Sequence, residues 1–429
     1  MIKTILLLNP VYVTLFWALV LTLENRKQQV PKLFLGRFMF VAFVLYLSHF
    51  FYFSGQLDVY LYLDSIYTLA SLLVYPLYHI YVRLLTVDRW FSVRSHGKYL
   101  LLPGLVFVLH LAGFMLMDRS EAMFYLEKVL PGQIPGHGMT GYMSFVYLLF
   151  RLVFIAQALF YLIINFKLIF AHNQRIEDFY SNVENRKLNW VQFFNITLGF
   201  TSLASITVAI TGRDAFAEDD IYLAIPSLIF SIMLFIIGFL GNIQGEVNPE
   251  ADEKETGMNE FDGSRSSGNI KNAPGQHIKQ TDNIPSGDKT TAAIERSNIA
   301  ADRQTGVKQD ELPDNTSTNP GKLKKRMESL FENDMIFRNP DLKIWDVSSL
   351  LGTNRTYISK IINTEYGRNF CNHVNYYRIQ YAKKIISTNS QLTNEEVAEL
   401  SGFGSVNSLY RAFRLVENKT IGDFRNSLT

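Results

Sequence analysis

Residues 402–414 read GFGSVNSLYRAFR, a tight turn with two glycines followed by a helix that has one apolar face. Ser405 is placed to cap this helix, because a serine hydroxyl at that position accepts a hydrogen bond from a free backbone amide. Leu409 and Phe413 lie one helical turn apart and predict the buried face. Residues 396–401 predict a shorter helix before the turn, so the segment has the form of a helix-turn-helix unit. The exposed face of its second helix carries Asn407, Ser408 and Arg411.

A second unit of the same form lies earlier in the chain. Residues 342–352 read LKIWDVSSLLG, with apolar side chains at helical spacing and a closing glycine that supplies a left-handed turn. Asn354 is then placed to cap a helix over residues 355–364. Between the two units, the apolar spacing over residues 374–386 predicts one long linking helix. The exposed face of the helix at 355–364 carries Arg355, Thr356, Ser359 and Lys360.

The linking helix and the second unit carry a recurring set of residues. These are Arg378-Ile379, Ala382 and Ile385-Ile386, then Val397-Ala398, Gly402-Phe403-Gly404-Ser405 and Leu409-Tyr410-Arg411-Ala412-Phe413-Arg414. On these motifs, the C-terminal quarter of the chain resembles the DNA-binding domain of AraC/XylS-type transcription regulators. The closing signature of that family, Gly-x-[ST]-Pro-x-x-[YF]-Arg, is weaker here. Asn418 replaces its glycine and Ile421 replaces its proline, so we expect the last turn to differ in geometry.

The resemblance implies an all-helical domain that binds double-stranded DNA. Its two recognition helices would enter successive major grooves, about 34 Å apart. From residue 322 onward, Lys and Arg exceed Asp and Glu by about five, a modest positive balance of the kind that DNA binding needs. A homodimer, and RNA polymerase if the protein is an activator, are further partners that the resemblance leaves open.

Two groups of side chains are candidates for DNA contact. Arginine can pair with guanine and asparagine with adenine in the major groove. For Arg411, pairing with an acidic neighbour is the alternative. The candidates for base contact are Arg355, Thr356, Ser359, Lys360, Asn407, Ser408 and Arg411. The candidates for phosphate contact are Lys383, Lys384 and Arg414, with Lys324, Lys325 and Arg326, and solvated surface charge is the alternative for this group.

The first half of the chain has a different character. Seven apolar stretches precede residue 243, each of roughly 18 to 25 residues, which is enough to cross a ~30 Å hydrocarbon core. We predict a bundle of seven transmembrane helices, since apolar helices of this number could not all be covered in water. The expected spans are approximately 5–23, 33–53, 60–84, 99–116, 142–163, 191–210 and 221–240.

Basic residues follow the first, third and fifth of these spans. The other connecting segments are poor in Lys and Arg, and the last is acidic. The positive-inside rule therefore predicts a multi-pass protein of the bacterial inner membrane, with its N-terminus outside and all residues after 240 in the cytoplasm. A cleaved signal peptide is the competing interpretation of the first span, but no small-residue cleavage site follows it. The basic residues are Arg26, Lys27, Lys32, Arg89, Arg94, Lys98, Lys167, Arg175, Arg186 and Lys187.

Polar side chains within the spans are candidates for sensing a signal. Asp64 and Arg151 are the main pair, because an intramembrane acid and base can form an ion pair. Packing hydrogen bonds are the alternative, and we favour them for His49, His79 and His110. The chain has one cysteine, Cys371, which excludes an internal disulfide and a cysteine-based zinc finger. We expect no catalytic residues, metal site or cofactor, and therefore no enzyme.

Three domains follow from this reading. Residues 1–243 form the membrane domain, 244–321 a disordered cytoplasmic linker, and 322–429 the DNA-binding domain. The linker is polar and without periodicity, so it cannot bury enough apolar area to order itself. Its r.m.s. reach is about 45–50 Å.

We therefore expect a membrane-integral one-component transcription regulator that senses a small-molecule or protein signal. The alternative is a transporter-like or channel-like membrane protein that uses its helix-turn-helix module to tether DNA. Proteolytic release of the DNA-binding domain is a third hypothesis.

Overall fold

The computed structural model describes residues 2–23, 29–88, 90–184, 186–211, 220–244 and 320–428. Within these ranges the regular secondary structure is helical, and one isolated antiparallel bridge joins Tyr180 to Lys343. The all-helical fold class is therefore confirmed. The expected linker at 244–321 and the acidic segment before the seventh span lie almost entirely outside the described residues.

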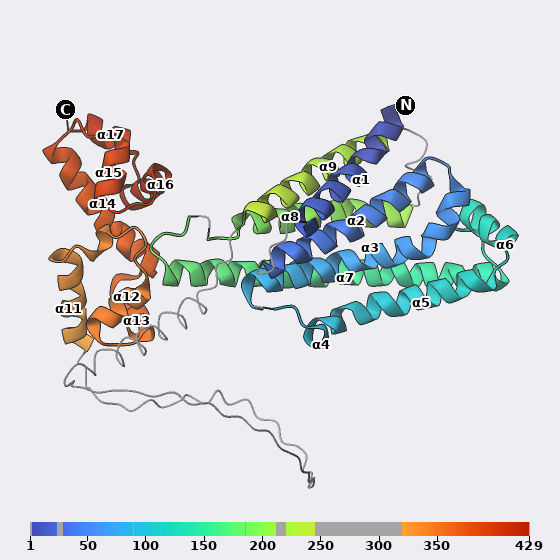
Figure 1. The fold of residues 1–429 in the computed structure, drawn as a ribbon, viewed down its shortest axis with the longest axis horizontal. Helices are drawn as coiled ribbons and strands as arrows, with labels where there is room; N and C mark the ends of the chain where they lie inside the picture. The colour runs from blue at the N-terminus through green and yellow to red at the C-terminus, as the bar shows by residue number, and fades with distance from the viewer. Residues whose placement is uncertain are drawn as a thin grey trace, which may run out of the picture. The chain divides into compact units, whose positions relative to one another are not determined.

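Each of the seven expected spans falls on a helix of the first half (Figure 1). Two short helices, α4 and α6, a 3-10 turn, η1, and a π-helical turn, η2, lie between them. The elements are α1 (Ile2–Leu23), α2 (Val30–Phe53), α3 (Leu57–Thr86), α4 (Val93–His96), η1 (Gly97–Leu100), α5 (Leu101–Leu116), α6 (Arg119–Phe124), η2 (Tyr125–Val129), α7 (Gly138–Phe179), α8 (Asn189–Thr211) and α9 (Asp220–Ile243).

Five segments of the described chain are long and apolar enough to cross a membrane. They are Thr4–Leu23, Val30–Phe53, Leu57–Thr86, Val93–Leu116 and Gly138–Phe179. Many of their large apolar side chains point outward, including Phe16, Leu102 and Leu148. Such a surface is suited to lipid rather than to water. The first half is therefore a membrane-associated domain, while the sixth and seventh spans stay predictions.

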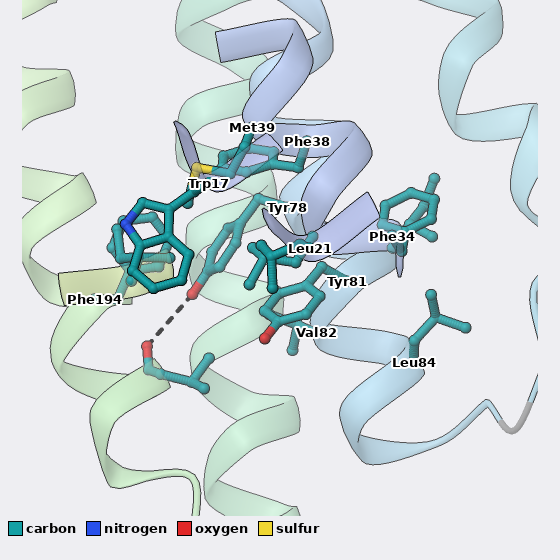
Figure 2. Close-up of a cluster of buried hydrophobic side chains, with 14 of the residues drawn as sticks. Trp17, Leu21, Phe34, Phe38, Met39, Tyr78, Tyr81, Val82, Leu84 and Phe194 are labelled. Carbon is teal, nitrogen blue, oxygen red and sulfur yellow. Dashed lines mark hydrogen bonds between the residues drawn. The ribbon is translucent and has the colours of Figure 1, made fainter. Parts of the chain in front are cut away.

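Aromatic side chains pack the interior of this bundle (Figure 2). Tyr78 of α3 lies edge-on to Phe194 of α8, with ring centroids 4.9 Å apart, and its hydroxyl donates to the carbonyl of Val191 at 3.4 Å. Gly238 of α9 lies against Trp17 of α1, where an added Cβ would be 2.3 Å from the indole ring. Small residues of this kind let membrane helices approach closely.

Helix α7 is longer than the sequence predicts. The expected span ends near residue 163, whereas the helix continues to Phe179 and has 42 residues. Buried side chains at helical spacing, including Ile169, His172 and Ile176, sustain the extension. At 1.5 Å per residue the helix is ~63 Å long, about twice the hydrocarbon thickness. It therefore extends well beyond the expected span.

The C-terminal region contains both predicted helix-turn-helix units. The first unit consists of α12 and α13, and the second of α15 and α16, with α14 as the predicted linking helix between them. Gly352 and Gly402 make the turns with positive φ of 63° and 83°, which glycine adopts without strain. The elements are α11 (Pro320–Glu332), η4 (Ile336–Arg338), α12 (Ile344–Leu351), α13 (Arg355–Tyr366), α14 (Phe370–Thr388), α15 (Asn394–Leu400), α16 (Val406–Glu417) and α17 (Ile421–Asn426).

Candidate nucleic-acid interface

The second unit presents a polar face at the beginning of α16. Ser405 caps the helix as expected, accepting a hydrogen bond from the backbone amide of Ser408 at 3.1 Å. Leu409 and Phe413 are fully buried, which turns the opposite face outward. Asn407 and Arg411 are exposed on that face, and Ser408 is half-buried. The local sequence rules therefore placed this helix and its faces correctly.

The first unit presents a similar face on α13. Asn354 caps the helix by accepting a hydrogen bond from the amide of Tyr357 at 3.1 Å. Ile358 and Ile362 are buried, as predicted, while the four candidate residues for base contact are exposed or half-buried. Tyr357 was missed by the sequence analysis, yet its side chain is 59% exposed next to these candidates. The sequence did contain a signal for Tyr357, because it directly follows Thr356, a candidate for base contact.

The candidates for phosphate contact are in different environments. Lys384 and Arg414 are exposed. Lys383 instead forms an ion pair with Glu417 at 2.9 Å, which ties α14 to the end of α16. The structure thus gives Lys383 an internal partner and leaves the other two on the surface.

Arg378 lies in the middle of the domain with a relative exposure of 1%. Its guanidinium donates to the carbonyl oxygens of Phe337 at 2.8 Å and Asn339 at 2.7 Å. Burial lowers the pKa of Arg378 to about 10. The side chain therefore joins the linking helix α14 to the segment before the first unit.

Comparison with known proteins assigns this domain. Residues 347–427 match the family model described as a helix-turn-helix domain. The C-terminal domain is an AraC/XylS-type helix-turn-helix domain. It marks the chain as a DNA-binding transcription regulator. No curated protein and no solved structure matches the chain.

The closing turn of the AraC-type domain is formed by the two residues that depart from its signature and by Thr420 between them. Asn418 ends α16 with a φ of 54°, a left-handed conformation that asparagine tolerates better than most residues. Thr420 then caps α17, and Ile421 is buried at the first helical position. Arg425 donates to the carbonyl oxygens of Ser390 at 2.8 Å and Leu392 at 2.6 Å. It is a structural residue that fastens α17 to the preceding loop.

A loop from the first half of the chain contacts the AraC-type domain. We define residues 180–184, which follow α7, as the docking loop. The amide of Ser181 donates to the carbonyl of Leu342 at 3.0 Å, and its hydroxyl accepts from Arg378 at 3.1 Å. Just before the loop, Glu177 accepts a hydrogen bond from Asn369 at 2.7 Å.

Glu184 of the docking loop contacts the second recognition helix directly. Its carboxylate accepts hydrogen bonds from the hydroxyls of Ser405 and Ser408, the latter at 2.7 Å, and pairs with Arg411 at 3.2 Å. The hydroxyl of Ser405, together with Ser408 and Arg411, lowers the pKa of Glu184. Arg411 therefore has an acidic partner, as the alternative reading allowed, although that partner is remote in the sequence.

The candidate sensor residues have separate surroundings in the membrane domain. Asp64 is buried, accepts a hydrogen bond from Tyr60 at 2.8 Å and lies 3.3 Å from the ring nitrogen of His110. Arg151 lies with its guanidinium carbon 4.4 Å from the ring centroid of Tyr147. The Asp64 carboxylate thus lies beside the ring of His110, and the sensor role of Asp64 and Arg151 stays a prediction. His79 and His49 make packing hydrogen bonds, to Asn165 at 2.7 Å and Tyr67 at 3.2 Å.

Proposed function

We propose that the chain is a membrane-integral one-component regulator, in which a seven-span domain senses a signal and the AraC-type domain reads DNA. One observation carries the proposal: a domain with two capped recognition helices shares a polypeptide with five helices of membrane-spanning length and composition. In this proposal the N-terminus lies outside, the membrane is the bacterial inner membrane, and the domain boundaries are 1–243, 244–321 and 322–429.

Arg355 and Arg411 are the leading base contacts of the two recognition helices. Both lie on the polar side of a helix whose other side is buried, so each can enter a major groove without disturbing the core. A bidentate arginine–guanine pair contributes roughly 1–3 kcal/mol of discrimination between bases. Loss of either side chain should relax specificity in one half-site.

Genome-wide immunoprecipitation of the full chain, followed by footprinting on the recovered DNA, tests this assignment. We expect Arg411→Ala to lose protection of one half-site and Arg355→Ala to lose protection of the other, each with a ~5- to 150-fold weaker affinity. Both are compared in chains that also carry Glu184→Gln, so that Arg411 is released from its acidic partner. Lys419→Ala serves as the control, because it removes a positive charge beyond the C-terminal end of α16. Unaltered protection by both arginine variants would refute the assigned contacts.

The transcript profile of a deletion strain addresses the proposed function itself. A regulator predicts a small set of changed genes that adjoin the recovered DNA sites. A membrane protein that only tethers DNA predicts bound sites without neighbouring changes in transcription, which would contradict the proposal.

A further inference from the structure

The carboxylate of Glu184 occupies a position suited to DNA. Ser405 and Ser408 lie at the beginning of α16, where the free amides and the helix dipole favour an anion. Two of the three groups that bind the carboxylate, Ser408 and Arg411, are those assigned to base contact. The same donors cannot serve Glu184 and DNA at once, so the two ligands exclude each other.

The rest of the docking loop also fills space in front of α16. A Cβ added at Gly404, in the turn before the helix, would lie 2.5 Å from the side-chain nitrogen of Asn182. Helices of this type approach the major groove with their N-terminal residues. A loop in van der Waals contact with that end of α16 leaves no room for a DNA backbone.

The loop is held on the domain at places that DNA does not need. Ser181 is fixed by Arg378 and by the carbonyl of Leu342, and its own carbonyl oxygen lies 3.4 Å from the thiol of Cys371. These contacts involve Arg378 and Cys371 of α14 and the carbonyl of Leu342 before α12, none of which is a candidate for DNA contact. The contacts of Ser181 fix the position of the loop on the domain, and Glu184 then places a negative charge against the beginning of α16.

We propose that the docking loop is an autoinhibitory element, which covers the second recognition helix until it is displaced. The inference rests on the proposed function, since it names the regulation of the same DNA-binding surface. Within the described residues, the hydrogen bonds and the ion pair of the Glu184 carboxylate are made with the second recognition helix and its cap. The docked protein therefore reads at most one half-site, and full operator binding requires release of the loop.

Helix α7 supplies a route from the membrane domain to this switch. It continues without interruption from Gly138 to Phe179, and the docking loop begins at the next residue. Glu177, in its last turn, both binds Asn369 and pairs with Lys187. A shift or rotation of α7 in the membrane would therefore move Glu184 relative to α16.

The first test removes the charge of Glu184 in the full chain, reconstituted in lipid nanodiscs. The probe is a duplex recovered in the immunoprecipitation experiment, at one fixed salt concentration because phosphate contacts make affinity salt-dependent. We expect Glu184→Gln to bind at least about fivefold more tightly, the low end of coupling between sites, and to extend the footprint into the second half-site. Asp178→Asn is the matched control, since it removes a nearby negative charge that is exposed at the end of α7.

The outcomes separate this inference from the proposed function. If neither the wild-type chain nor Glu184→Gln binds any recovered duplex, the proposed function fails. If both bind with equal affinity and protect both half-sites, the function stands and autoinhibition is wrong. Equal gains from Glu184→Gln and Asp178→Asn would also overturn autoinhibition, because general charge repulsion would then account for both.

The second test locks the loop in place. Asn182→Cys and Gly404→Cys place thiols on the two sides of this contact, where a Cβ at position 404 lies 3.5 Å from the side-chain carbonyl carbon of Asn182. A disulfide then needs a small adjustment of the loop. In a chain that also carries Glu184→Gln, we expect oxidation to abolish protection of the second half-site and reduction to restore it. Protection of both half-sites by the oxidised chain, or failure of the two cysteines to cross-link, would contradict the docked arrangement.

Discussion

At the scale of single residues, buried polar side chains hold the AraC-type domain together. Arg378 is the clearest case, because its guanidinium is almost fully buried and satisfies two backbone carbonyls that precede the first unit. A buried acceptor that loses its donor keeps the full cost of its desolvation. The domain therefore depends on this one cation more than on any surface ion pair.

We predict that Arg378→Met destabilises the AraC-type domain by about 2–6 kcal/mol, since two carbonyl groups lose their partner at ~1–3 kcal/mol each. Hydrogen exchange of α14 and α16 in the full chain measures this as a lower free energy of opening. Lys384→Met is the control, because it makes the same change of size and charge on the exposed face of α14. Equal exchange rates in the two variants would show that the buried hydrogen bonds contribute little.

At the scale of elements, close contacts between helices organise the membrane domain. Gly238 lets α9 rest directly on the indole ring of Trp17, whereas Gly104 of α5 has no atom within 4 Å of an added Cβ. The same chemical change therefore has opposite consequences at the two positions. At one, a methyl group must displace an aromatic ring; at the other, it only limits the freedom of the backbone.

We predict that Gly238→Ala lowers the thermal stability of the detergent-solubilised chain, because overpacking of this kind costs about 1–3 kcal/mol. Gly104→Ala should leave it unchanged or raise it slightly, as alanine favours a helix by up to ~1 kcal/mol over glycine. Thermal unfolding followed by tryptophan fluorescence, to which Trp17 itself contributes, gives the comparison. A Gly238→Ala variant as stable as wild type would mean that Trp17 can move aside.

The elements also show why sequence reasoning succeeded in some places and not in others. The caps at Asn354 and Ser405 follow from chemistry within a few residues, and both were predicted correctly. The continuation of α7 to Phe179 was not predicted, because the sequence analysis located only the apolar span at 142–163, and the composition becomes more polar after it. The contact between Glu184 and Arg411 joins residues 227 positions apart, and no local pattern encodes such a pairing. The proximity of Asp64 and His110, 46 positions apart, was not foreseen for the same reason.

At the scale of the whole molecule, the proposed topology must bring the docking loop and the AraC-type domain to the same side of the membrane. An odd number of crossings between the N-terminus and residue 180 achieves this if the N-terminus lies outside. The segment before α7, which includes Ile134, then faces outward. In this topology α8 and α9 are the sixth and seventh spans. They cross the membrane twice more, so the chain after α9 lies on the same side as the docking loop.

Fusions to alkaline phosphatase test this topology, because the enzyme needs disulfides that form only outside the cytoplasm. We predict activity for fusions after residues 134 and 215, and none after residue 182. Fluorescent-protein fusions at the same positions should give the complementary pattern. Activity after residue 182 would reverse the orientation, and inactivity after residue 215 would remove the sixth and seventh spans.

The contact of Glu184 with an exposed arginine has a consequence for affinity. The side chain of Arg411 is 68% exposed and that of Glu184 is 26% exposed, so water screens much of their attraction. The contact between Glu184 and Arg411 must be weak for DNA to compete with it. Glu184 belongs to the same polypeptide, so it acts on α16 at an effective concentration on the order of millimolar. An operator is present in a cell at a far lower concentration. A buried, strongly bound carboxylate at this position would keep the recognition helix occupied permanently. With a partly solvated carboxylate, a signal can shift the equilibrium between the docked and the released loop.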